Sequence, residues 1–248
     1  MNDWIIPDWP APGNVKALFT TRNGGVSHGV KGTYASLNLG AHVKDNPADV
    51  ECNRALLRCH LPGEPRWLKQ MHGTYPVWID KTTTLTQEGD AALSRKQGVV
   101  CAVMVADCLP VFLCDTAGTT VGIVHAGWRG LAGGIIEQSI AAMPVEHNKL
   151  MAWLGPAIGP DHFEVGADVY EAFVKQDAQA AQAFVSKNSN HENKWLADIF
   201  LLARQRLEGI GITEIYGGEI CTFSDSARFF SYRRDGDTGR MAALIWLE

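Results

Sequence analysis

Continuous runs of apolar residues mark the segments that we predict to be buried strands. Apart from Met104, residues 99–106 are small or β-branched apolar residues, and no polar position alternates with them, which is typical of a strand covered on both faces. Asn23 and the two glycines after it predict a turn, because Asn-Gly and Gly-Gly sequences accept positive φ. Further apolar runs predict strands at 17–21, 109–113, 120–124, 151–154, 212–216, 229–232 and 242–247.

Helical spacing of apolar residues predicts helices at 48–59, 131–143, 167–176 and 195–207. In the first of these, Val50, Leu56 and Leu57 lie near one predicted face. Strand and helix signals mix without strict βαβ alternation, and neither a G-x-G-x-x-G nor a P-loop sequence is present. We therefore expect an α+β fold with mixed sheets and helices packed outside them. The absence of repeats and linkers predicts a single domain over 1–248.

Composition and charge narrow the classes of partner. The net charge of -5 and the lack of any run of Lys or Arg argue against a nucleic-acid surface. The longest apolar run, 98–106, is too short to span a bilayer, so no membrane partner is expected. Residues 1–4 show no basic segment leading into an apolar stretch, and the six cysteines form no C-x-x-C pair. These features predict a cytoplasmic protein with free thiols.

Three metal-capable residues lie in segments that look unlike ordinary core. Cys108 follows the predicted strand at 99–106, and His125 follows the predicted strand at 120–124. His72 lies between Met71 and Gly73. Strand ends open onto crevices, where ligands usually bind. Two imidazoles and one thiolate suit zinc and leave one position for water or substrate. The alternatives are a buried thiol and hydrogen-bonded histidines, since the spacing matches no short metal-binding motif.

Residues next to these three suggest further roles. Arg129 begins the helix after His125, where backbone N–H groups would favour phosphate, although a solvated arginine fits that position as well. Asp107 could orient a histidine, act as a general base or simply form a turn. An aromatic slot for a planar base, or ordinary core, could be formed by Trp128, Phe229, Phe230 and Tyr232.

Seven segments in a fixed order resemble one known family. They are TTRNGGVS at 20–27, SLNLG at 36–40, QMHG at 70–73, DCLP at 107–110, HAGWRG at 125–130, GPAIGP at 155–160 and TGR at 238–240. The family is the YfiH-like family, known as multicopper polyphenol oxidoreductase (laccase) and also as purine nucleoside phosphorylase. The resemblance runs from about residue 17 to the C-terminus.

The resemblance implies a zinc ion bound by His72, Cys108 and His125. It implies phosphorolysis of adenosine, inosine and methylthioadenosine, with deamination of adenosine as a second activity. It also implies a β-sandwich with outer helices, similar to the catalytic domain of cytotoxic necrotizing factor. Some members are described as peptidoglycan editing factors that remove a misincorporated L-serine from a cell-wall precursor.

The laccase description can be tested on the histidine count. A multicopper oxidase needs about ten histidines, largely in His-x-His pairs, for its copper centres. This chain has eight histidines, and no two are separated by a single residue. The sequence therefore argues against a four-copper enzyme. A Cu²⁺ ion could still replace zinc in the same ligands, because copper binds most nitrogen and sulfur sites more tightly.

Three functional hypotheses follow. The first is a zinc enzyme acting on purine nucleosides and phosphate, with catalytic residues His72, Asp107, Cys108 and His125. Its candidates for substrate or phosphate binding are Arg22, Asn38, Arg54 and Arg129. The second is an amidase on a peptidoglycan precursor, in which Cys108 is the nucleophile and His125 its base. The third is a non-catalytic nucleoside-binding protein. A monomer is compatible with the sequence.

Overall fold

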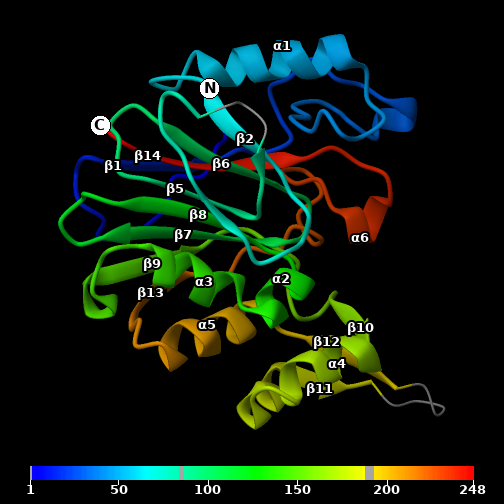
Figure 1. The fold of residues 1–248 in the computed structure, drawn as a ribbon. Coiled ribbons are helices and arrows are strands. Elements are labelled where there is room, and N and C mark those ends of the chain that lie inside the picture. The colour runs from blue at the N-terminus through cyan, green and yellow to red at the C-terminus, as the bar shows by residue number, and fades with distance from the viewer. Residues whose placement is uncertain (1, 84–86, 188–192) are drawn as a thin grey trace.

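The computed structural model describes residues 2–83, 87–187 and 193–248. Two β-sheets lie face to face at its centre, and helices cover both outer faces (Figure 1). One sheet has the strand order β1 (Val15–Phe19), β14 (Met241–Leu247), β6 (Val100–Val105), β2 (Pro65–Lys69) and β4 (Gln87–Glu88). The other has the order β13 (Glu214–Gly217), β9 (Leu150–Leu154), β7 (Leu109–Asp115), β8 (Val121–Ala126), β5 (Ala91–Ser94) and β3 (Pro76–Trp78).

Both central sheets are mixed, as the irregular alternation of elements predicted. In the first sheet, β6 pairs antiparallel with β14 and parallel with β2. In the second, β7 pairs antiparallel with β8 and β9, whereas β13 runs parallel to β9. A small third sheet contains β10 (Glu164–Gly166), β12 (Lys194–Ala197) and β11 (Phe184–Ser186). It lies at the edge of the molecule beside α4 (Ala167–Val174) (Figure 1).

The continuous apolar strands are explained by burial on both faces. Along β6, Cys101 and Val103 point into the core between the two large sheets, while Ala102 and Met104 point toward α1 (Pro47–Arg58). All six residues of β6 are buried, so no polar position alternates with the apolar ones. On the far side of the second sheet, the core is completed by α2 (Trp128–Gly133), α3 (Ile135–Ala142) and α5 (Ile199–Gly209).

Three predicted elements were wrong, each for a local reason. The helix at 131–143 is two helices, because Gly134 adopts φ 95° between α2 and α3. The helix at 195–207 starts only at Ile199, where Asp198 accepts hydrogen bonds from the Phe200 and Leu201 amides at 2.9 and 3.0 Å. Residues 194–197 instead form β12, which is held between β10 and β11.

The third wrong element is the strand at 229–232. Phe229 and Phe230 are fully buried, but the chain leads into the short helix α6 (Tyr232–Asp235) rather than a sheet. Of the three apolar residues placed near one face of the first helix, Val50 and Leu57 on α1 are buried, whereas Leu56 is 44% exposed. No helix in the described parts of the chain combines the length and the apolar character needed to cross a membrane.

Candidate functional site

His72, Cys108 and His125 come together at one end of a cavity. Their donor atoms all lie within 4.8 Å of one another, and Sγ of Cys108 is 3.9 Å from Nε2 of His72. The two imidazole rings meet edge to face, with centroids 4.7 Å apart. His125 is 2% exposed, whereas His72 is open to solvent. Two nitrogen donors and one sulfur donor at this separation make a possible metal site.

Sheet pairing explains why residues so distant in sequence meet. β2 and β6 run parallel, so the segments that follow them, which carry His72 and Cys108, leave the sheet at the same edge. His125 lies at the end of β8 and pairs with Pro110, close behind Cys108 in the chain. Gly127 is needed beside them, because a Cβ atom there would lie 2.9 Å from the His72 ring and 3.2 Å from Sγ of Cys108.

Asp90 holds both histidines and was missed by the sequence analysis. Its carboxylate accepts hydrogen bonds from the backbone amides of Met71, His72 and Gly73 at 3.1, 2.9 and 2.7 Å. The same carboxylate lies 2.8 Å from Nδ1 of His125 and is only 1% exposed. It therefore fixes the loop that carries one imidazole and leaves Nε2 of the other for a metal. A single acidic residue before a short apolar run gave no signal for this role.

The cluster also sets the charge of its members. Burial alone would raise the pKa of the Cys108 thiol, but the positive charge of His125 and hydrogen bonds from His125 and His72 lower it to about 6. Burial opposes protonation of His125, yet the Cys108 thiolate and Asp90 raise its pKa to about 9. By contrast, burial raises the pKa of the Cys101 thiol. Burial and the negative charge of Asp115 raise the pKa of the Cys114 thiol to about 12. Cys108 is thus a thiolate near neutral pH, the form that binds metals and acts as a nucleophile.

Metal removal is therefore expected to expose one additional reactive cysteine. Without metal, Cys108 should be alkylated by iodoacetamide at pH 7, and more slowly as the pH falls through about 6 and the thiolate is protonated. With zinc added back it should be protected. Peptide mass spectrometry measures both states, with exposed Cys52 and Cys59 as sites that react either way. Equal alkylation of Cys108 with and without zinc would contradict its role as a ligand.

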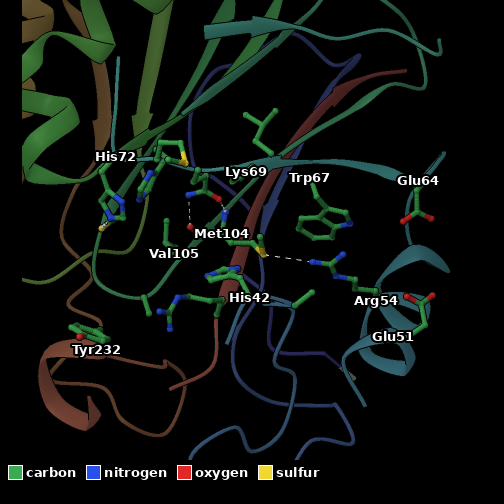
Figure 2. A pocket seen from close by; sticks show the side chains of 18 of the residues that line it. His42, Glu51, Arg54, Glu64, Trp67, Lys69, His72, Met104, Val105 and Tyr232 are labelled. Carbon is green, nitrogen blue, oxygen red and sulfur yellow. Dashed lines mark hydrogen bonds between the residues drawn. The ribbon is translucent and has the colours of Figure 1, made fainter. Parts of the chain in front are cut away.

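The cluster opens into a cavity of about 1110 Å³. Figure 2 shows His72 at one end and Trp67, Arg54, Glu51 and Glu64 toward the other, with His42 between them. The loop after β2 is fixed by Gln70, whose amide donates to the Met104 carbonyl and accepts from the Met104 amide, both at 2.8 Å. The remaining lining residues that matter for charge or stacking are Arg58, Lys69, Tyr232 and Arg240.

Asp107 does not orient a histidine, because the carboxylate that contacts His125 is that of Asp90. Its buried carboxylate accepts hydrogen bonds from the Thr222 and Ser231 hydroxyls at 2.7 and 3.0 Å and from the Arg233 amide at 2.7 Å. Its backbone has φ 85°, a turn conformation. With these donors Asp107 ties the C-terminal segment to the end of β6 and does not line the cavity.

Replacing Asp107 with alanine is expected to reduce stability rather than to change the chemistry selectively. The two hydroxyls and the amide would lose their acceptor, at a cost of about 1–3 kcal/mol for buried unsatisfied groups. Denaturant unfolding measures the loss, and Asp107→Asn should recover part of it because one acceptor oxygen remains. A variant of unchanged stability whose turnover has collapsed would instead support the general-base role.

The four predicted anion-binding or substrate-binding residues do not lie together. Arg54 lines the cavity and stacks over Trp67, with its guanidinium 4.6 Å from the ring centroid. Arg22 donates to the carbonyls of residues 35, 226 and 32 at 2.8, 3.2 and 3.3 Å, and it is not a lining residue. Arg129 is exposed and does not line the cavity. Its guanidinium lies over Trp128, 4.3 Å from the ring centroid.

The fourth of them, Asn38, is fully buried outside the cavity. Its side chain donates to Asp45 at 2.9 Å and accepts from the amides of Gly40 and Arg240, both at 2.9 Å. Asn38 therefore fixes the backbone around Arg240. Arg240 itself lines the cavity and was not among the predicted binding residues, although it closes the last of the seven sequence segments.

Comparison with known proteins identifies the family of this chain. A family model described as multi-copper polyphenol oxidoreductase laccase matches residues 16–248. A purine nucleoside phosphorylase of Pseudomonas aeruginosa is 50% identical over 248 residues, and the purine nucleoside phosphorylase YfiH of Escherichia coli is 49% identical over 249, each match covering 100% of both chains. The crystal structure of a Neisseria meningitidis protein matches with a TM-score of 0.91 at 49% identity, covering 99% of each chain. The chain therefore belongs to the YfiH-like family.

Proposed function

We propose that this protein is a zinc-dependent purine nucleoside phosphorylase that acts on adenosine, inosine and methylthioadenosine and also deaminates adenosine. The observation that carries the proposal is the convergence of His72, Cys108 and His125 at one end of a cavity of about 1110 Å³. Relatives that match the whole chain bear the name purine nucleoside phosphorylase. A cavity of this size accommodates a small organic substrate.

The donor set fits zinc. Zinc takes imidazole nitrogen at about 2.0–2.1 Å and thiolate at about 2.3 Å, so its ligands must lie a few ångströms apart, as these three do. A zinc ion there would supply a Lewis acid that also acidifies water at neutral pH. The lowered pKa of Cys108 supports thiolate ligation, and the bond from Asp90 to Nδ1 of His125 supports ligation through Nε2.

The chain's own groups would perform the remaining tasks. Tyr232, which lines the cavity and is 60% exposed, offers an aromatic face on which a purine ring can stack. Asp90 keeps the two histidines in place through its four hydrogen-bond partners.

A multicopper oxidase does not fit the described residues. Among them, His72, Cys108 and His125 are the one group of three metal-capable residues close enough to share an ion. A type 1 centre and a trinuclear cluster need several such groups. A copper ion that displaces zinc from these ligands could give copper-loaded protein weak oxidase activity without a four-copper site.

The test is elemental analysis of protein purified without added metal, followed by assays on a nucleoside panel with and without phosphate. We expect about one zinc per chain and release of hypoxanthine from inosine only when phosphate is present. Release of serine from a peptidoglycan precursor, without nucleoside turnover, would favour the amidase. Nucleoside binding without any turnover would favour the binding protein. Polyphenol oxidation by the zinc form would overturn the metal assignment.

A further inference from the structure

Arg240 brings a positive charge to the cavity without an ion-pair partner. Its Nη1 donates to the Thr238 and Gly239 carbonyls at 2.7 and 3.1 Å. No ion pair of the described residues, with N···O up to 4.0 Å, includes this guanidinium. Burial lowers the pKa of Arg240, and the negative charges of Cys108 and Asp237 oppose this only in part. A half-buried cation that retains donors is suited to an anion.

The position of Arg240 is built into the backbone around it. Its own amide donates to Asn38 at 2.9 Å, and its aliphatic stem lies against Gly40. A Cβ atom at Gly40 would come within 2.8 Å of Cγ of Arg240, so the close approach requires a glycine. The two carbonyls that hold Nη1 then fix the guanidinium, which leaves fewer conformations to lose when a ligand binds.

His42 adds a second donor in the middle of the same cavity. Figure 2 shows it between His72 and Arg54. Burial, followed by the positive charges of Arg240 and Arg54, lowers the pKa of His42, so the ring is neutral at pH 7 and can donate one N–H. Of the other lining cations, Arg58 pairs with Glu64 at 2.8 Å and Lys69 with Glu88 at 2.7 Å. Arg54 instead directs both Nε and Nη2 at the Leu39 carbonyl, at 3.0 and 2.9 Å, and stacks over the Trp67 ring.

We infer that Arg240 and His42 form a subsite for a phosphoryl oxyanion beside the His72–Cys108–His125 cluster. Planar guanidinium donors match two phosphate oxygens at once, and a neutral imidazole can donate to a third. The oxyanion is either inorganic phosphate or the phosphate ester of a nucleotide. The role of this subsite in catalysis rests on the proposed function, whereas its binding of a phosphate group does not.

With inorganic phosphate, the reaction at this subsite would be phosphorolysis of the nucleoside. An oxygen of hydrogen phosphate forms a bond to the ribose C1′ while the bond from C1′ to the purine nitrogen breaks. The electron pair of that bond stays with the purine, which takes up the proton of the hydrogen phosphate. The products are ribose 1-phosphate and the free base. Arg240 and His42 would hold the phosphate for this attack, which supplies the positioning that a bimolecular displacement needs.

The experiment measures phosphate binding and kinetics in the zinc-loaded protein. In Arg240→Met we expect calorimetric binding of inorganic phosphate, without nucleoside, to weaken about ten- to hundredfold, because a charged hydrogen-bond donor is lost. The KM for phosphate should rise similarly, while that for inosine changes less than threefold. His42→Gln should have a smaller effect in the same direction. Arg95→Met, which removes an exposed arginine just beyond the end of β5, is the matched charge control.

Arg240→Lys guards against a folding defect, because it keeps the charge but loses the planar fork. It should fold as the native chain does and still bind phosphate several-fold more weakly. Inosine 5′-monophosphate separates the two sources. A phosphate ester is the ligand if the nucleotide binds more tightly than inosine, if Arg240→Met removes this difference, and if the KM for phosphate is unchanged in that variant.

The outcomes separate the two proposals. Loss of phosphate binding in Arg240→Met in a protein that has no phosphorylase activity keeps the subsite and overturns the proposed function. Phosphate and nucleotide binding equal to that of the native chain in both Arg240 variants overturns the subsite. The subsite is also overturned if the KM for phosphate rises greatly in Arg129→Ala and not in Arg240→Met, and if nucleotide binding does not depend on Arg240.

Discussion

Replacing Cys108 with alanine is expected to remove the metal and nearly all nucleoside turnover while leaving the fold intact. The thiolate is one of the three protein donors, and it is the one donor of the three that binds zinc as an anion. Its side chain is only partly buried, so the packing lost is small compared with a core residue. Zinc content, turnover of inosine and the far-ultraviolet circular dichroism spectrum measure the three effects.

Cys114→Ala is the matched control for this experiment. Cys114 is a buried thiol on β7 that lies in the core between the two large sheets and not at the cavity. Its replacement should reduce stability modestly and leave the zinc content unchanged. A Cys108→Ala variant that keeps both zinc and activity would exclude the thiolate as ligand and as nucleophile. Retained zinc with lost activity would favour the nucleophile.

The second large effect is expected at Asp90. Asp90→Asn keeps the shape but offers a single acceptor oxygen to three backbone amides and an imidazole, so at least one contact is lost. The negative charge that keeps His125 oriented is lost as well. Removing such a partner of a metal ligand weakens metal binding about 10- to 100-fold. Competition with a chromophoric chelator measures the zinc affinity, and the visible spectrum of the cobalt form reports the ligand geometry.

Asp115→Asn provides the control, because it is another buried carboxylate with several donors. Asp115 accepts from the Thr119 amide and hydroxyl, both at 2.7 Å, and from the Thr120 amide at 2.8 Å, in the turn between β7 and β8. The Asp115→Asn variant should be less stable than the native chain, with unchanged zinc affinity and an unchanged cobalt spectrum. If both variants lower stability equally and neither changes the metal affinity, Asp90 is a structural residue only.

The strands were predictable from the sequence because their pattern follows directly from their surroundings. β6 lies between two cores, so every side chain is apolar and the run from 99 to 106 is continuous. Helix ends were less predictable because they depend on one residue each. Asp198 stops the backward extension of α5, and Gly134 divides α2 from α3. The apolar spacing across both positions continues, so periodicity alone joined the segments.

The three donor residues could be proposed from sequence, whereas their neighbours could not. His72, Cys108 and His125 lie near strand ends and in segments that resemble the family, and both features are local. Of the three arginines proposed as anion ligands, Arg54 lines the cavity, whereas Arg22 and Arg129 do not. The folded chain also brings Arg240, from the opposite end of the sequence, to the cavity.

The sequence by itself determined the buried strands, the mixed α+β class and the identity of the candidate donors, because each depends on residue type and local pattern. Only the tertiary structure decided which charges face the cavity and which carboxylate holds the histidines. Asp90 reaches His125 through the pairing of β5 with β8, and Asp107 turns away toward Thr222 and Ser231. Such contacts are set by the register between strands and by backbone turns. Neither of these leaves a periodic trace in the residues themselves.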